Sequence, residues 1–138
     1  MAADGSWSVA LNATDGQQRS QILLRVKEAL KQLHAAGFVH GDVRASNVLY
    51  KVEPDNTVKV MLIDFDESGR VGLAHYGPLP FNAAIQRAPG VAPGMAIDPQ
   101  HDLWPTESAK RFLGKSWRLT KTTIRCKSLV SAVLTLKK

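Results

Sequence analysis

The sequence predicts an α+β fold, and three segments of its 138 residues carry that prediction. Apolar side chains at helical spacing run from Gln17 to Ala36. Two strand-like runs, "NVLYKV" and "TVKVMLIDF", follow after a short polar loop. An irregular stretch rich in glycine and proline then extends from Ser68 to Gln100. We therefore expect a helix, a loop, a β-hairpin and an irregular segment, in that order.

The first of these segments has the apolar pattern of one helical face. Its buried side is predicted at offsets 0, 1, 4, 8 and 11, which correspond to Ile22, Leu23, Val26, Leu30 and Leu33. Gly37 stands where a helix commonly ends in a left-handed cap. His34 lies beside the apolar face, and we interpret it as a structural residue and not as a metal ligand.

The two strand-like runs are separated by "EPDN", in which Pro, Asp and Asn all favour a turn. If the turn is centred near Asp55 and Asn56, the numbers of paired residues sum to about 111 in an antiparallel hairpin. Asn47 and Asp64 satisfy that sum. The sequence therefore predicts that they face each other at the open end of the hairpin.

The loop before the hairpin, "HGDVRASN", enters that same open end and carries Asp42 five residues before Asn47. Two carboxylates and a carboxamide, from Asp42, Asp64 and Asn47, could therefore converge. Mg²⁺ suits one or two carboxylates together with substrate phosphates, which leaves one carboxylate free to act as a base. In the alternative interpretation, these polar residues only cap the ends of the strands.

The net charge of +6 is distributed unevenly along the chain. Residues 1–104 hold 9 Lys/Arg and 11 Asp/Glu, whereas residues 105–138 hold 9 Lys/Arg and one acidic residue, Glu107. We expect an N-terminal extension over residues 1–16, a folded region over residues 17–104, and a solvated or poorly packed basic C-terminal tail over residues 105–138. A patch that binds nucleic acid or an acidic partner is the alternative for that tail.

Composition and cysteine content also indicate the cellular compartment in which the protein occurs. The apolar fraction of 44% and the charged fraction of 22% are those of an ordinary globular chain. Cys126 is alone, which excludes an internal disulfide and a cysteine pair with metal-ligand spacing. The first residues lack a basic start followed by an apolar run, and no segment approaches 18 apolar residues. We expect a cytoplasmic or nuclear protein with no membrane partner.

A family resemblance joins these features. "HGDVRASN" resembles the catalytic-loop motif of the protein-kinase-like superfamily, and "LIDFDES" resembles its metal-binding Asp-Phe-Gly strand end. The resemblance covers about residues 17–104 and implies a truncated protein-kinase-like C-terminal lobe. Taken together, these two motifs are most similar to those of kinase-like domains that are abundant in mushroom-forming fungi. The Gly after the His also resembles that of small-molecule kinases of the aminoglycoside phosphotransferase type. The resemblance therefore implies either a protein hydroxyl or a small-molecule hydroxyl as the acceptor.

The resemblance implies a role for four residues of the site. Asp42 would accept the proton of the acceptor hydroxyl, and Arg44 would stand near the transferred phosphate. Asn47 and Asp64 would hold Mg²⁺, with ATP as the second cofactor.

It also implies two structural residues and shows three departures from the family pattern. His40 would be a structural member of the loop, and Asp102 in "DPQHDLW" would brace the loop; a solvent-exposed Asp102 is the alternative. Gly41 replaces the usual Arg, and Asp66 replaces the Gly after Phe65. "RAPG" at residues 87–90 is weakly similar to the family's Ala-Pro-Glu anchor.

The largest departure lies before Gln17, where no glycine-rich phosphate loop and no Val-Ala-Ile-Lys pattern occur. Lys27 and Lys31 lie on the predicted helix instead. We therefore expect a kinase-family phosphotransferase by resemblance that is incomplete and inactive on its own. The alternatives are a non-catalytic pseudokinase or interaction module, and a nucleic-acid binder that acts through the basic tail.

Overall fold

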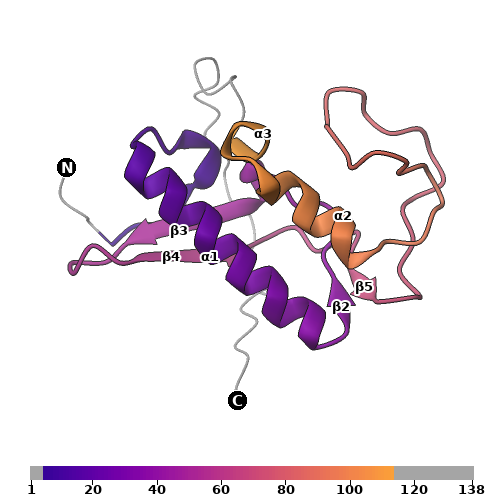
Figure 1. Cartoon of the computed structure of the whole chain (residues 1–138), viewed down its shortest axis with the longest axis horizontal. Helices are drawn as coiled ribbons and strands as arrows, with labels where there is room; N and C mark the ends of the chain where they lie inside the picture. The colour runs from indigo at the N-terminus through magenta and orange to yellow at the C-terminus, as the bar shows by residue number, and fades with distance from the viewer. Residues whose placement is uncertain (1–4, 114–138) are drawn as a thin grey trace.

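The computed structural model describes residues 5–113 of the chain and confirms a mixed α+β architecture. Figure 1 shows the long helix α1 running across the β3–β4 hairpin. The elements follow one another as β1 (Ser8–Val9), η1 (Ala10–Asn12), α1 (Gly16–Ala35), β2 (Phe38–Val39), η2 (Ala45–Asn47), β3 (Val48–Val52), β4 (Val58–Leu62), β5 (Gly69–Arg70), α2 (Pro99–Leu103), η3 (Trp104–Glu107) and α3 (Ala109–Leu113).

Both ends of α1 are fixed by local hydrogen bonds. The Asp15 carboxylate caps the first turn by accepting from the Gln18 backbone N–H at 2.8 Å. At the other end, Gly37 adopts a φ of 86° and donates its N–H to the His34 carbonyl at 2.9 Å. The predicted helix and its glycine cap are therefore confirmed, with a shift of one residue at each boundary.

The predicted hairpin is present, but its predicted register is wrong by one residue. Val48 lies opposite Leu62, and the Ile63 N–H donates to the Asn47 carbonyl at 2.9 Å. Asn47 is therefore the partner of Ile63, and Asp64 follows just beyond the last pair. Asn47 and Asp64 still lie at the same open end of the hairpin.

The turn explains the shift. Asn56 adopts the left-handed conformation, with a φ of 64°. Its N–H donates to the Glu53 carbonyl at 2.9 Å, and the Glu53 N–H donates to the Thr57 carbonyl at 2.9 Å. This is a three-residue hairpin loop closed by a left-handed residue. Because one more residue lies in the loop than a two-residue turn allows, every pair moves by one.

The main core lies between α1 and the sheet, whose strand order is β1-β3-β4. Ile22, Val26 and Leu30 of α1 are fully buried in it. The chain before α1 also contributes, because β1 pairs with β3 and Ala10 is fully buried. No helix among residues 5–113 is long and apolar enough to cross a membrane.

The first residues of the predicted basic tail belong to this core. Thr106, Phe112 and Leu113 are 1%, 4% and 1% exposed, and both apolar side chains join the main cluster. Thr106, Phe112 and Leu113 are therefore packed and not solvated, whereas Glu107 is exposed. The rest of the predicted tail, residues 114–138, lies outside the described residues.

Residues 71–98, which we call the irregular segment, contain no helix and only one isolated β-bridge, between His75 and Ala96. This confirms the irregular character expected between Ser68 and Gln100. The segment leaves β5, which pairs with β2, and returns to the start of α2 (Figure 1). It closes on itself where the Ile97 N–H donates to the Ala74 carbonyl at 2.9 Å.

Candidate functional site

The site is built on the loop His40–Asn47, which we call the catalytic loop, and its first residues are held by one buried carboxylate. Asp102 of α2 is 1% exposed. Its carboxylate accepts hydrogen bonds from the backbone N–H groups of His40 and Gly41, both at 2.8 Å. The His34 Nε2 lies 2.9 Å from the same carboxylate. Of the two alternatives for Asp102, the structure has the buried one, in contact with the loop.

His40 ties the loop to the end of the hairpin. It is fully buried, and its Nδ1 accepts the Asp42 backbone N–H at 3.2 Å. The ring proton is therefore on Nε2, which donates to the Ile63 carbonyl at 3.0 Å. The His40 ring also packs on Phe65, with centroids 4.7 Å apart. His40 thus joins the loop directly to the residues on either side of Asp64.

Gly41 shows why the usual Arg is absent at this position. Its φ is 86°, a conformation that side chains rarely adopt. A Cβ atom there would lie 2.9 Å from the Glu67 Cβ and 3.0 Å from the Ile97 Cδ1. The close approach of residue 67 and the irregular segment therefore requires glycine.

Asp42 has a side chain that is 14% exposed and fixed by two neighbours. Its Oδ2 accepts from the Asn47 Nδ2 at 2.9 Å and from the Arg44 Nη2 at 3.1 Å. The Arg44 Nε lies 3.0 Å from Oδ1, but its N–H does not point at that oxygen, so this second contact is ionic. The Asn47 Nδ2 also donates to the Asp42 carbonyl at 2.9 Å. Asn47 is 6% exposed, and its Oδ1 accepts from no other described residue.

Asp64 contrasts with Asp42 because it is exposed and has no side-chain partner among residues 5–113. Its φ of 61° is left-handed, so the chain turns sharply where the hairpin ends. Its neighbour Ile63 is hydrogen bonded to Asn47, which puts the Asp64 carboxylate and the Asn47 carboxamide at one end of the hairpin. Asp66, the departure two residues later, is also exposed.

The donor set at this end suits a hard cation. Carboxylate and amide oxygens are the ligands that Mg²⁺ prefers. Neither the Asp64 carboxylate nor the Asn47 Oδ1 has a side-chain partner in the part of the chain that the structure describes. The described residues hold no group of three or more His, Cys, Asp or Glu side chains that could bind a metal alone. A Mg²⁺ ion would therefore depend on oxygens of a bound substrate as well.

Comparison with known proteins identifies the family. Residues 5–73, half of the chain, match the model of the lipopolysaccharide kinase (Kdo/WaaP) family. The chain belongs to this family. The matched residues include the helix α1, the whole catalytic loop and the hairpin, and therefore Asp42, Asn47 and Asp64. The expected membership of the protein-kinase-like superfamily is confirmed, and the mixed α+β fold is compatible with a partial kinase-like domain.

A second comparison supports the wider protein-kinase-like superfamily and not the Kdo/WaaP family in particular. The chain is 31% identical over 90 residues to the mouse (Mus musculus) protein "Ribosomal protein S6 kinase alpha-3". Those residues are 64% of this chain and only 12% of that relative, so the chain spans a small part of the curated protein it matches. No solved structure matches the chain.

The contact of His34 with Asp102 agrees with the interpretation of His34 as a structural residue. Nothing local in the sequence indicates the partner, because Asp102 is 68 residues away. A buried acidic residue that accepts two backbone N–H groups was foreseen only through the resemblance. The third contact of the Asp102 carboxylate, from His34, depends on the packing of α1 against α2.

Proposed function

We propose that this chain carries the catalytic-loop half of a Mg²⁺- and ATP-dependent phosphotransferase centre that acts on a protein hydroxyl. One observation carries the proposal. Asp42, held by Arg44 and Asn47, lies at the same end of the hairpin as the unpaired carboxylate of Asp64. An oriented base next to free oxygen ligands is the arrangement that phosphoryl transfer requires.

Each residue has a distinct chemical task in this proposal. Asp42 accepts the proton of the acceptor hydroxyl, and the contacts from Arg44 and Asn47 hold its carboxylate in one orientation. Arg44 also offers positive charge near the transferred phosphate. The Asn47 Oδ1 and Asp64 hold Mg²⁺, and the Mg²⁺–ATP complex supplies the phosphoryl group when it is bound.

We expect weak nucleotide binding and no turnover from this chain alone. The sequence before Gln17 contains neither a glycine-rich phosphate loop nor a strand lysine. Loss of a single preorganised electrostatic contact typically costs about 10²–10³ in rate, and two are missing here. ATP as the phosphate donor and the single Cys126 both suit a cytoplasmic or nuclear setting.

The test combines binding and transfer. Calorimetry with Mg²⁺–ATP should detect weak binding that Asp64→Ala abolishes and that Asp66→Ala, a nearby exposed acid, leaves intact. Isotope-labelled ATP with a panel of protein and small-molecule acceptors should give no labelled product above background. If the chain transfers labelled phosphate and Asp42→Ala abolishes that transfer, the centre is not incomplete and this part of the proposal is wrong. If Asp64→Ala leaves Mg²⁺–ATP binding unchanged, the proposed metal site is wrong.

The names of the similar proteins favour two different acceptors. The family name refers to kinases of lipopolysaccharide, whereas the mouse relative is named as a kinase of a ribosomal protein. A carbohydrate or other small-molecule hydroxyl is therefore the second candidate acceptor. We propose the protein hydroxyl because the surface beside the catalytic loop is an open groove.

A further inference from the structure

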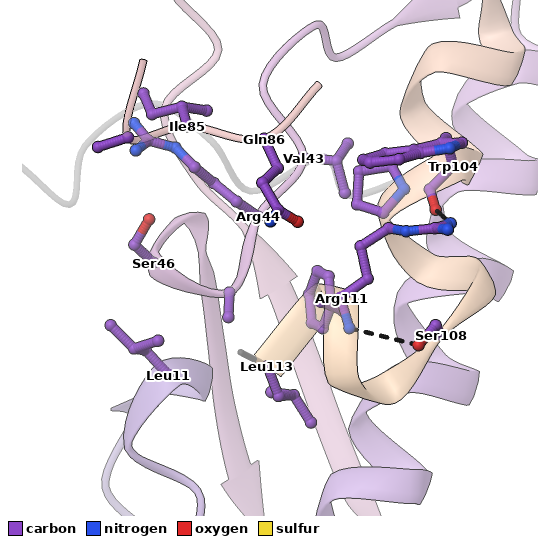
Figure 2. Close-up of a pocket in the computed structure, with 14 residues that line it drawn as sticks. Leu11, Val43, Arg44, Ser46, Ile85, Gln86, Trp104, Ser108, Arg111 and Leu113 are labelled. Carbon is purple, nitrogen blue, oxygen red and sulfur yellow. Dashed lines mark hydrogen bonds between the residues drawn. The ribbon is translucent and has the colours of Figure 1, made fainter. Parts of the chain in front are cut away.

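The groove beside the catalytic loop has a volume of about 780 Å³. Arg44 and Ser46 of the loop form one side, Ile85 and Gln86 of the irregular segment form another, and Arg111 of α3 lies across from them. Figure 2 shows the two arginines on opposite sides, with Gln86 between them. Three parts of the chain that are distant in sequence thus meet at one surface.

The lining of the groove carries positive charge, although each of its two arginines is also paired with a carboxylate outside the lining, Asp42 or Glu107. The lining side chains include two arginines and no Asp or Glu. The side chains of Arg44 and Arg111 are 39% and 30% exposed. Apolar side chains, among them Leu11 and Leu113, complete the walls. A ligand that matches this surface carries negative charge and some apolar surface.

Arg111 is held in place before any ligand binds. Its guanidinium lies 3.9 Å from the Trp104 ring, and its Nη1 donates to the Trp104 carbonyl at 2.9 Å. Its ion pair with Glu107, at 3.0 Å, involves a carboxylate that is 57% exposed and does not line the groove. Because exposed ion pairs are weak, this pair leaves Arg111 able to bind a second carboxylate. Little side-chain entropy is then lost on binding.

Arg44 connects the groove to the base. Arg44 contacts the Asp42 carboxylate and also lines the groove, so a ligand in the groove lies one side chain away from Asp42, which does not itself line the groove. The exposed Gln86 carboxamide and the Ser46 hydroxyl offer partners for peptide N–H and C=O groups. An extended polypeptide uses all of these features at once.

We propose that the groove binds the acceptor as an extended acidic peptide and that Arg111 is a specificity-determining residue that binds an acidic side chain near the acceptor hydroxyl. This inference rests on the proposed function and names its substrate class. The chain's own next residues, 114–138, do not match the groove, because they contain only basic residues among their charged side chains.

The test measures peptide binding without Mg²⁺ or ATP, so that it is independent of the metal site. A fluorescent decapeptide with one serine among glutamates is compared by anisotropy with the same peptide carrying lysines. We expect the full chain to bind the acidic peptide, and Arg111→Gln to weaken binding about tenfold, which corresponds to about 1.4 kcal/mol. Arg25→Gln, which removes the same charge from an exposed site on α1, should change it little.

A second variant covers the case in which Arg111→Gln fails to fold. Gln86→Glu adds a negative charge at an exposed position of the groove and should also weaken binding of the acidic peptide. Equal binding of both peptides would overturn the proposal, and so would equal effects of Arg111→Gln and Arg25→Gln. Binding of an anionic glycolipid in vesicles, with no binding of the peptide, would assign the groove to the other acceptor class. If Asp64→Ala abolishes Mg²⁺–ATP binding but leaves peptide binding intact, the proposed metal site and the proposed peptide groove are shown to be independent.

Discussion

The catalytic loop and the irregular segment are neighbours in space, yet they are held by different forces. The loop is fixed by buried polar contacts, with Asp102 accepting two backbone N–H groups and His40 bonded to the hairpin end. These groups are costly to leave unpaired, because no water replaces a lost partner. The loop therefore has one favoured geometry.

The irregular segment is held mainly by backbone hydrogen bonds, by ring contacts and by a small apolar cluster of Val39, Tyr76 and Ile97. The Arg87 guanidinium lies 4.1 Å from the Phe81 ring and 5.2 Å from the Tyr76 ring, and a single β-bridge joins His75 to Ala96. Leu73 and Leu79 are 72% and 76% exposed. The difference indicates that buried polar contacts fix the loop that carries Asp42, whereas the irregular segment leaves large apolar side chains exposed.

The largest expected effect is at Asp102. Asp102→Ala leaves the buried N–H groups of His40 and Gly41 without an acceptor, and each costs about 1–3 kcal/mol. We expect the free energy of unfolding to fall by about 3 kcal/mol in urea denaturation. Asp66→Ala, the exposed control, should change it by less than about 0.5 kcal/mol. Equal effects of the two variants would remove the distinction between the loop and its surroundings.

A smaller loss of stability is expected from alanine substitution at two glycines that have similar backbone conformations but different surroundings. Gly41 and Gly90 have φ values of 86° and 82°, but only Gly41 has neighbours where a Cβ would stand. Gly90→Ala should cost about 1 kcal/mol from backbone strain alone. Gly41→Ala should cost about 2 kcal/mol or more, because Glu67 or Ile97 must also move. Thermal unfolding of both variants checks the order, and the reverse order would contradict the tight packing of the loop.

The smallest effect concerns the irregular segment at high pH. Burial raises the pKa of Tyr76 from 10.0 to about 12, and the negative charge of Asp102 adds to the rise. The folded state therefore opposes ionisation. This contribution to stability is present below pH 10 and is lost as the pH rises from 10 toward 12. When the pH is raised from 9 to 11, the free energy of unfolding measured in urea should fall by about 1 kcal/mol less in Tyr76→Phe than in the wild type. Identical losses would show that Tyr76 is not buried in solution.

The sequence could predict the elements whose signals are local. The apolar spacing of Ile22 to Leu33 indicates α1, Gly37 indicates its end, and "EPDN" indicates the hairpin turn. The register was missed because the left-handed Asn56 adds a residue to the turn, and the identities of the turn residues do not settle the loop length. Strands of two residues, such as β1 and β5, are too short to show a period.

The parts of the site that depend on long-range packing could not be predicted in the same way. Asp42, Asn47 and Asp64 could be assigned to one oxygen-rich site because the predicted hairpin by itself brings them to the same end. The contact of His34 with Asp102 requires two helices to meet. The groove requires Arg111, which the sequence places in a basic tail, to lie across from Arg44. Charge counted along the chain cannot show where these side chains meet in space.

The most direct test of the central claim is the location of a divalent ion. Mn²⁺ can replace Mg²⁺ at an oxygen-ligand site and broadens the NMR signals of nearby amides. With Mn²⁺ and ATP, we predict selective broadening at Asn47 and at Ile63 to Phe65. Asp64→Ala should abolish this broadening and Asp66→Ala should preserve it. Broadening centred away from this end of the hairpin, or the same broadening in the Asp64→Ala variant, would contradict a phosphotransferase centre there.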